Sequence, residues 1–164
     1  MTMVKRVAFF LFFYWGCVHS ITAQTARNHY DEGVEQAELK DYKGAILCFN
    51  RAIRLDPKFV EAYIERGDAK GKVKDHLGAI QDYSTAIELR PTYAAYFNRA
   101  FEKIGIEDFA GGLLDIDQAI RLDRKQEQAY NLRGLAKFAL EDMEGAIKDF
   151  TKAIKIDPKI CLGL

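Results

Sequence analysis

The strongest constraint on the fold is that the sequence repeats itself. The segment Lys40–Pro57, KDYKGAILCFNRAIRLDP, returns in similar form at Lys74–Pro91, Glu107–Arg124 and Glu141–Pro158. A fixed period of this length indicates a solenoid, in which each unit packs only on its neighbours. Solenoids usually provide binding surfaces, so the sequence constrains the architecture more tightly than the ligand.

Each repeat divides into two amphipathic helices. In the fourth repeat, apolar residues at helical spacing predict a first helix over Glu127–Leu140 and a second from about Met143 to Ile156, joined by a turn at residues 141–142. Asp157-Pro158 ends the second helix, because the residue before a proline is pushed out of the helical region. The sequence therefore predicts an all-α chain.

Small residues recur where the two helices must touch. The middle of each first helix carries Gly or Ala, at Gly33, Gly67, Ala100 and Gly134. The second helices carry large residues that we expect to fill the space between the pair: Phe49, Tyr83, Ile116 and Phe150. A glycine inside a helix costs about 1 kcal/mol relative to alanine, which close approach of the two helices can offset.

These features resemble the tetratricopeptide repeat family. The resemblance rests on an aromatic early in the first helix, Gly or Ala four residues on, Ala–aromatic–Ala in the second helix and then Pro, and it covers Ala26–Pro158. It implies an α-α superhelix of antiparallel helix pairs with four units, at 26–59, 60–92, 93–126 and 127–160, before a short tail at 161–164. The pattern departs from the family at His29, Ile116 and Arg124, which replace two aromatics and a proline.

An internal covariation predicts structural ion pairs. One position of the first helix carries arginine in three units, at Arg66, Arg99 and Arg133, and one position of the second helix carries aspartate in the same units, at Asp82, Asp115 and Asp149. The first unit has neither, with Glu32 and Cys48 instead. We expect each Arg to pair with an Asp of its own or an adjacent unit. The alternative is that these are independent, solvent-exposed charges.

The family resemblance implies that the first helices line a concave groove, which is the candidate binding site. Its expected lining is Tyr30, Val34, Ile64, Asp68, Phe97, Asn98, Phe101, Ile104, Asn131, Leu135 and Phe138. The second half of this set is apolar and aromatic, which favours a peptide or protein partner. The alternative is that these aromatics pack inside the superhelix. Some family members hold carboxyl-terminal peptides of chaperones with a Lys and Asn clamp, but the first unit has Tyr30 and Val34 there, so that function is not expected.

The sequence contains no pattern that indicates catalysis. No histidine lies at i, i+4 from a carboxylate ligand, no CxxC pair is present, and there is no nucleophile motif or glycine-rich phosphate loop. We therefore expect no cofactor, no metal and no small-molecule substrate. Lys and Arg number 24, as do Asp and Glu, so no basic excess points to nucleic acid.

Both ends of the chain carry predictions of their own. Lys5 and Arg6 precede the apolar run Val7–Val18 and a stretch of small residues, which predicts a secretory signal over 1–23 and an exported protein, periplasmic or secreted. The alternatives are an uncleaved membrane anchor, which would make the protein a membrane-tethered assembly factor, and lipidation at Cys17. After Pro158 only KICLGL remains, too short and apolar to cap a solenoid, so either this tail folds back or the end associates with another molecule. A longer parent chain is a third reading.

Overall fold

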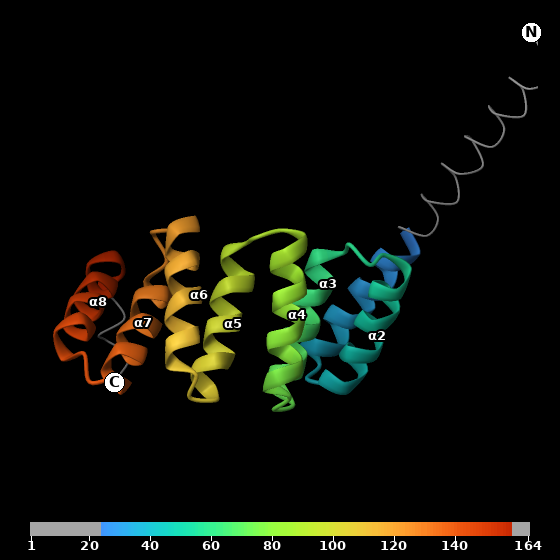
Figure 1. Cartoon of the computed structure of the whole chain (residues 1–164). Helices are drawn as coiled ribbons and strands as arrows, with labels where there is room; N and C mark the ends of the chain where they lie inside the picture. Colours follow the sequence, from blue (N-terminus) through green and yellow to red (C-terminus); the bar gives the residue numbers. More distant parts are fainter. Residues whose placement is uncertain (1–23, 159–164) are drawn as a thin grey trace, which may run out of the picture.

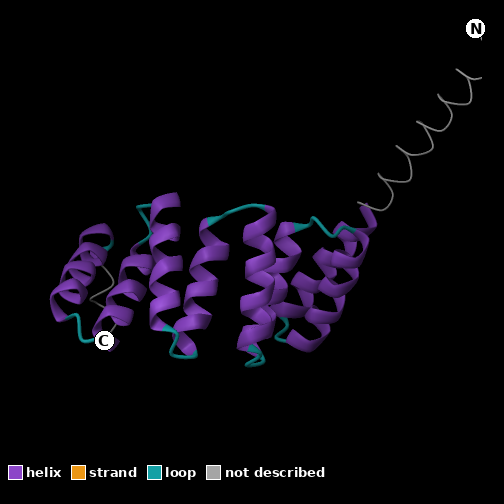
Figure 2. Cartoon of the chain, in the orientation of Figure 1, coloured by secondary structure: helices purple, strands orange, loops and turns teal. Residues whose placement is uncertain are grey.

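The structure, a computed structural model, describes residues 24–158, and these form helices joined by short connections (Figure 2). The first helix occupies 24–38 in the described part. It is followed by α2 (Tyr42–Leu55), α3 (Val60–Lys72), α4 (His76–Leu89), α5 (Tyr93–Gly105), α6 (Phe109–Leu122), α7 (Glu127–Ala139) and α8 (Met143–Ile156). The fourth unit's second helix has the predicted bounds, and its first helix ends one residue earlier than predicted.

The helices form one row that follows the order of the chain (Figure 1). We call the first helix of each unit an A helix (24–38, α3, α5, α7) and the second a B helix (α2, α4, α6, α8). From α2 to α8, each helix packs mainly on its neighbours in sequence, but α3 also contacts α5 and α5 contacts α7. No two B helices of this range make such contacts. Because the A helices contact one another and the B helices do not, the row of helices is curved, with the A helices on its inner side.

The same turn joins the A and B helices of every unit. An aspartate caps each B helix, its side chain accepting a hydrogen bond of 2.9–3.0 Å from the amide three residues on, at Asp41, Asp75, Asp108 and Asp142. The residue before each cap has φ between 63° and 66°, at Lys40, Lys74, Glu107 and Glu141. The amide donor is always a glycine, because a Cβ there would overlap the capping carboxylate. The chain thus reverses direction over the three residues between the two helices.

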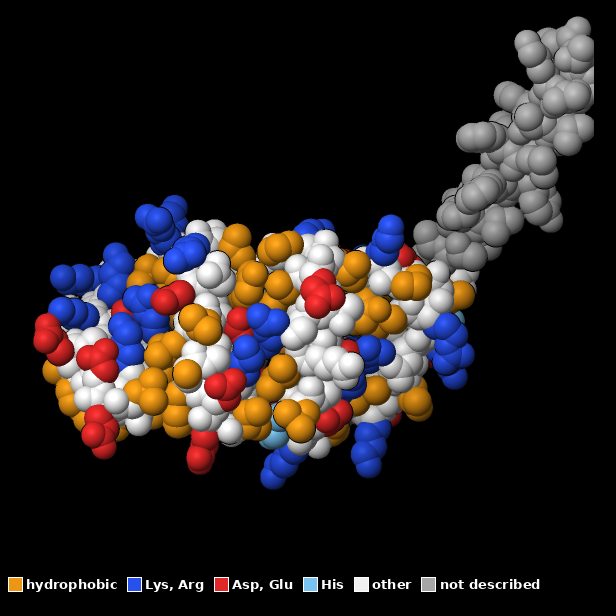
Figure 3. All heavy atoms as spheres, in the orientation of Figure 1, with side chains coloured by type: hydrophobic (Ala, Val, Ile, Leu, Met, Phe, Trp, Pro, Cys, Tyr) orange, Lys and Arg blue, Asp and Glu red, His pale blue; other side chains and the backbone are white. Residues whose placement is uncertain are grey.

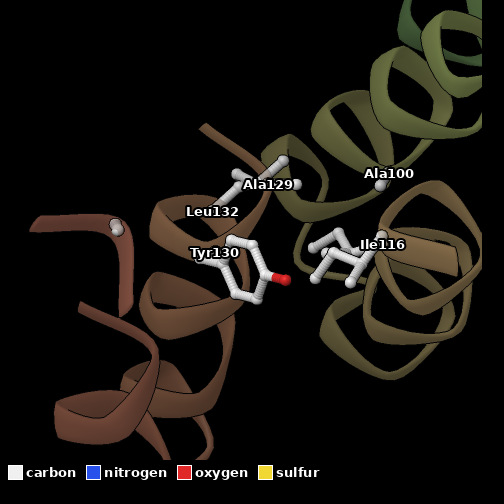
Figure 4. Packing of buried hydrophobic residues seen from close by; sticks show 7 residues of the cluster. Ala100, Ile116, Ala129, Tyr130 and Leu132 are labelled. Atoms are coloured by element: carbon white, nitrogen blue, oxygen red, sulfur yellow. The ribbon is translucent and has the colours of Figure 1, made fainter. Parts of the chain in front are cut away.

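Small residues of the A helices interlock with large residues of the B helices. A Cβ added to Gly33 would lie 2.6 Å from the ring of Phe49, and one added to Gly67 would lie 2.7 Å from the ring of Tyr83. The third unit solves the same packing differently, with Ala100 beside Ile116, both fully buried (Figure 4). An alanine is accommodated there because the partner side chain is no longer a ring.

The two ends of the chain lie outside the described residues, and so do the predicted signal at 1–23 with Cys17 and the tail at 161–164. Of the helices described, none combines the length and the apolar character needed to cross a membrane.

Candidate functional site

Each arginine of the covarying set holds the aspartate of its own unit in a two-pronged ion pair. Nε donates to Asp Oδ2 at 2.8–2.9 Å and Nη2 donates to Oδ1 at 2.6 Å, for Arg66–Asp82, Arg99–Asp115 and Arg133–Asp149. The three aspartates are only 2–4% exposed. The structure thus brings all six residues together as intra-unit pairs between the A and B helices, and not across units.

A third hydrogen bond extends each arginine to the preceding unit. Nη1 donates to the Oδ1 of Asn50 from Arg66 at 2.6 Å, to the hydroxyl of Ser84 from Arg99 at 3.0 Å, and to Asp117 Oδ1 from Arg133 at 2.6 Å. Each of these three arginines therefore joins three helices and fixes the spacing between its own unit and the preceding one. Sequence reasoning missed this arm, because the acceptor changes identity from unit to unit.

A lysine one helical turn after each arginine completes the neutralisation of the aspartate. Lys137 Nζ lies 2.7 Å from Asp149 Oδ2, and Lys70 and Lys103 occupy the same place in their units. Burial alone would raise the pKa of Asp149, but the hydrogen bonds from Arg133 and Lys137 outweigh it and lower the pKa. The carboxylate is therefore charged at neutral pH and serves the fold.

The first unit replaces this pair with a buried thiol. Cys48 stands where the other B helices have aspartate and is 6% exposed. Burial raises the pKa of its thiol, and neighbouring Glu32 raises it further. A thiol in this setting is protonated and packs as a small apolar residue.

The expected groove residues of the first unit and Ile64 serve mainly in packing. Tyr30 contacts the rings of Phe49 and Phe59, with centroids 5.8 and 4.9 Å away. Val34 and Ile64 are partly buried and pack against apolar clusters of their units. These three residues shape the inner face but leave little of their own surface for a ligand.

Two carboxylates of α3 lie half-buried on the inner face without an ion pair inside the described range. Asp68 Oδ1 accepts hydrogen bonds from the Tyr83 hydroxyl at 2.5 Å and from Asn98 Nδ2 at 2.8 Å. Burial raises the pKa of Asp68 despite these bonds and the nearby charge of Lys72. Burial, and then the charge of Asp68, raise the pKa of Glu65. Asn98 is thus already committed to Asp68 and is not a free amide for a ligand backbone.

The expected apolar half of the groove divides into buried and exposed residues. Phe97 stacks on Tyr93 with centroids 5.5 Å apart, and Ile104 packs against the cluster of α5 to α8, so both belong largely to the interior. Asn131 is half-buried. The exposed members are Phe101, Leu135 and Phe138, with 59%, 50% and 57% of their surface accessible. We call these three residues the apolar patch.

The apolar patch lies in register with one of the carboxylates of α3, Asp68. Asp68, Phe101 and Leu135 occupy the same position of three successive A helices, one residue after the small residue of each. The hydrogen bond from Asn98 to Asp68 ties α5 to α3 one turn before Phe101. Since packed helices lie about 8–10 Å apart, the inner face presents carboxylate, aromatic and aliphatic groups in a line across three units.

A separate cavity of about 530 Å³ lies where α6 meets α7 and α8. Its lining includes four basic side chains, Arg121, Arg124, Arg133 and Lys152, together with Asp117, Ile120 and Tyr130. None of these residues belongs to the expected groove. Sequence reasoning missed this cavity; the feature that could have pointed to it is Arg124, which stands where the other three units have proline. In residues 24–158, no group of three or more His, Cys, Asp or Glu is arranged to hold a metal ion.

Three family profiles match the chain. Those described as "Tetratricopeptide repeat" match residues 60–93 and 127–160, and one described as "TPR repeat" matches 33–73. Together they cover more than half of the sequence. The chain belongs to the tetratricopeptide repeat family. These matches leave out 94–126, the unit in which Ile116 and Arg124 depart from the pattern.

Solved structures show the same all-α repeat superhelix, which confirms the predicted fold class. MamA matches with a TM-score of 0.79 and 21% identity, over 84% of this chain and 81% of that one. MamA from Desulfovibrio magneticus RS-1 matches with a TM-score of 0.77 and 22% identity, over 82% of this chain and 76% of that one. The first tetratricopeptide domain of Spaghetti (RPAP3), bound to an HSP90 peptide, matches with a TM-score of 0.71 and 21% identity, over 73% of this chain and 95% of that one. At such identities the likeness concerns the fold alone. No curated protein sequence matches the chain.

Proposed function

We propose that this protein is a non-catalytic scaffold that binds a protein or peptide along the concave face of its A helices. The observation that carries the proposal is the apolar patch, because Phe101, Leu135 and Phe138 expose half or more of their surface on two A helices that contact each other. Arg66, Arg99 and Arg133 hold successive units at a fixed spacing. The surface is therefore formed before a partner arrives, and binding requires little ordering of this protein.

The charges beside the patch favour one kind of partner segment. Glu65 and Asp68 are half-buried carboxylates that form no ion pair within residues 24–158, and a partner's Lys or Arg would relieve the cost of their burial. A segment with a basic residue followed by apolar side chains fits this line of groups. An acidic peptide, such as the HSP90 peptide SRMEEVD bound to the RPAP3 domain, would meet repulsion here.

The B helices present a competing surface. Leu77, Leu114 and Ile147 are 66–72% exposed, one on each of three B helices. They stand apart because the B helices do not contact one another, whereas α5 and α7, which carry the apolar patch, do contact each other. We therefore place the partner on the inner face and use the outer residues as a matched control.

A crosslinked pull-down from the native host tests the proposal. The test variant replaces the apolar patch by Phe101→Ser, Leu135→Ser and Phe138→Ser, and the control variant carries Leu77→Ser, Leu114→Ser and Ile147→Ser. Losing three apolar contacts of about 1 kcal/mol each predicts roughly 100-fold weaker capture by the first variant only. Both must keep the helical circular dichroism of the wild type. A partner that survives the first variant and disappears with the second would refute the inner-face proposal.

We propose also that the segment 1–23 directs export to the periplasm or the medium, with retention as a membrane anchor as the alternative. Its basic residues followed by an apolar run support this proposal. Amino-terminal sequencing of the protein isolated from its host decides between the two: a start near Gln24 supports export, and an intact Met1 or Thr2 supports the anchor.

The last described helix favours self-association. Ile154 of α8 is 41% exposed, while Ile120, at the same position of α6, is 9% exposed because α7 covers it. We propose that a second copy covers this surface of α8. Light scattering of the purified protein should show a species larger than the monomer, and Ile154→Lys should shift it to the monomer mass. A wild type that is monomeric throughout would contradict the proposal.

A further inference from the structure

The cavity between α6, α7 and α8 carries an excess of positive charge that the fold does not use. Arg121, Arg124 and Lys152 line it, and none of the three forms an ion pair with any residue in the range 24–158. The fourth cation, Arg133, is neutralised by Asp149 and by Asp117, the only carboxylate of the lining. Figure 3 shows Lys and Arg side chains gathered over the end of the molecule that contains α6 to α8.

The same joint in the other units does not have this charge. At the positions of Arg121, Arg124 and Lys152, the joint between the first and second units has Arg54, Pro57 and Thr85, and the next joint has Glu88, Pro91 and Gln118. The superhelix therefore does not need the three cations together, since the first joint has a cation at only one of these positions and the second at none. Their coincidence at one joint requires a separate explanation.

The buried ring of Tyr130 organises this cavity. Its hydroxyl donates a hydrogen bond of 3.3 Å to the carbonyl oxygen of Arg124, which fixes the connection between α6 and α7. Lys152 Nζ lies 5.9 Å from the centre of the same ring, so α8 brings its ammonium group to the same place. Ile120 and the ring supply an apolar wall, and the cations lie around it. The volume of about 530 Å³ is in the range of small-molecule sites.

We propose that this cavity binds a small phosphate ester, whose phosphate is held by Arg121, Arg124 and Lys152 and whose organic part lies against Tyr130 and Ile120. Two guanidinium groups suit a phosphate, because each can donate two parallel hydrogen bonds to its oxygens. A dianion also matches three unpaired cations better than a single carboxylate does. This site is independent of the partner-binding face, with which it shares no residue.

Phenyl phosphate is a suitable probe, because it combines a dianionic phosphate with a flat apolar ring. Titration of the ¹⁵N-labelled full chain at low ionic strength should shift the amide signals of residues 120–126 and 150–154 in a saturable manner. Benzoate, with the same ring and a single charge, should bind at least tenfold more weakly. Raising the salt concentration should weaken the binding of phenyl phosphate, since the cations are exposed.

Two variants with the same loss of charge make the test specific. Arg121→Gln/Arg124→Gln/Lys152→Gln removes the cavity cations, and Arg51→Gln/Arg54→Gln/Lys58→Gln removes three exposed cations around the first joint. The first should bind phenyl phosphate roughly 30-fold more weakly, through the loss of charge-assisted hydrogen bonds, and the second should match the wild type. The proposal is overturned by equal weakening in both variants, by benzoate binding as well as phenyl phosphate, or by the absence of saturable shifts at millimolar concentration.

Discussion

Replacing Gly33 by alanine tests whether the packing between the A and B helices is as tight as the structure shows. The new Cβ would lie 2.6 Å from Cε1 and 2.7 Å from Cδ1 of Phe49, whose ring is fully buried and cannot move aside freely. Overpacking of this kind costs about 1–3 kcal/mol, and the better helix propensity of alanine returns about 1 kcal/mol. We therefore expect a net loss of about 1 kcal/mol in the free energy of unfolding.

The third unit indicates how to relieve this clash. It has alanine at the position of Gly33 and isoleucine at the position of Phe49, and both Ala100 and Ile116 are fully buried. Phe49→Ile alone should cost about 2 kcal/mol, because it leaves space where the ring was. In the double variant the methyl group occupies part of that space, so we expect a total loss of about 1 kcal/mol instead of the additive 3 kcal/mol.

Urea unfolding followed by circular dichroism measures these differences, provided that the four proteins share one slope with urea. Gly105→Ala is the matched control, since no atom lies within 4 Å of its added Cβ, and it should be neutral or stabilising. Additivity of the two changes within about 0.5 kcal/mol would refute the argument, because it would mean that Gly33 and Phe49 are not coupled. A Gly33→Ala variant more stable than the wild type would refute it as well.

Two further predictions concern carboxylates. Asp115→Ala should lower the free energy of unfolding by about 3 kcal/mol, because it leaves Arg99 and Lys103 without their buried counter-charge. Asp31→Ala, at an exposed pair, should cost less than about 0.5 kcal/mol. Similar losses for the two variants in urea unfolding would contradict a structural role for the buried ion pairs. Asp68→Asn should raise the melting temperature at pH 7. Burial raises the folded-state pKa of Asp68, so stability falls as the pH rises from the unfolded pKa of about 3.9 through the folded value, and the amide removes this loss. A variant that melts lower than the wild type at pH 7 would show that the charge of Asp68 stabilises the fold.

Much of the architecture could be predicted from the sequence because each unit repeats the same local signals. Helical periodicity and the proline after Asp157 placed the fourth unit's helices within one residue of their observed ends. Comparison of the units with one another also pointed to the arginine and aspartate pairs, since residues that change together in repeats occupy a common environment. It did not show that they pair within one unit, which depends on how the A and B helices pack.

The candidate surfaces were harder to predict, because exposure depends on contacts between units. Helical spacing placed Phe97, Phe101 and Ile104 of α5 on the inner face. Phe97 and Ile104 pack against a buried cluster, and only Phe101 of these three remains largely exposed. The cavity was missed entirely. Its three unpaired cations come from α6, α8 and the connection between α6 and α7. Arg121 and Lys152 are 31 residues apart, and nothing local in the sequence links them.

The third arm of each arginine has a mechanical consequence. Between the first and second units it ends on an amide oxygen, between the second and third on the Ser84 hydroxyl at 3.0 Å, and between the third and fourth on a carboxylate at 2.6 Å. The chain connecting α4 to α5 is also one residue shorter than its counterparts, which leaves less slack there. Under tension along the axis of the superhelix, the interface between the second and third units would therefore separate first, and the interface between the third and fourth units would separate last.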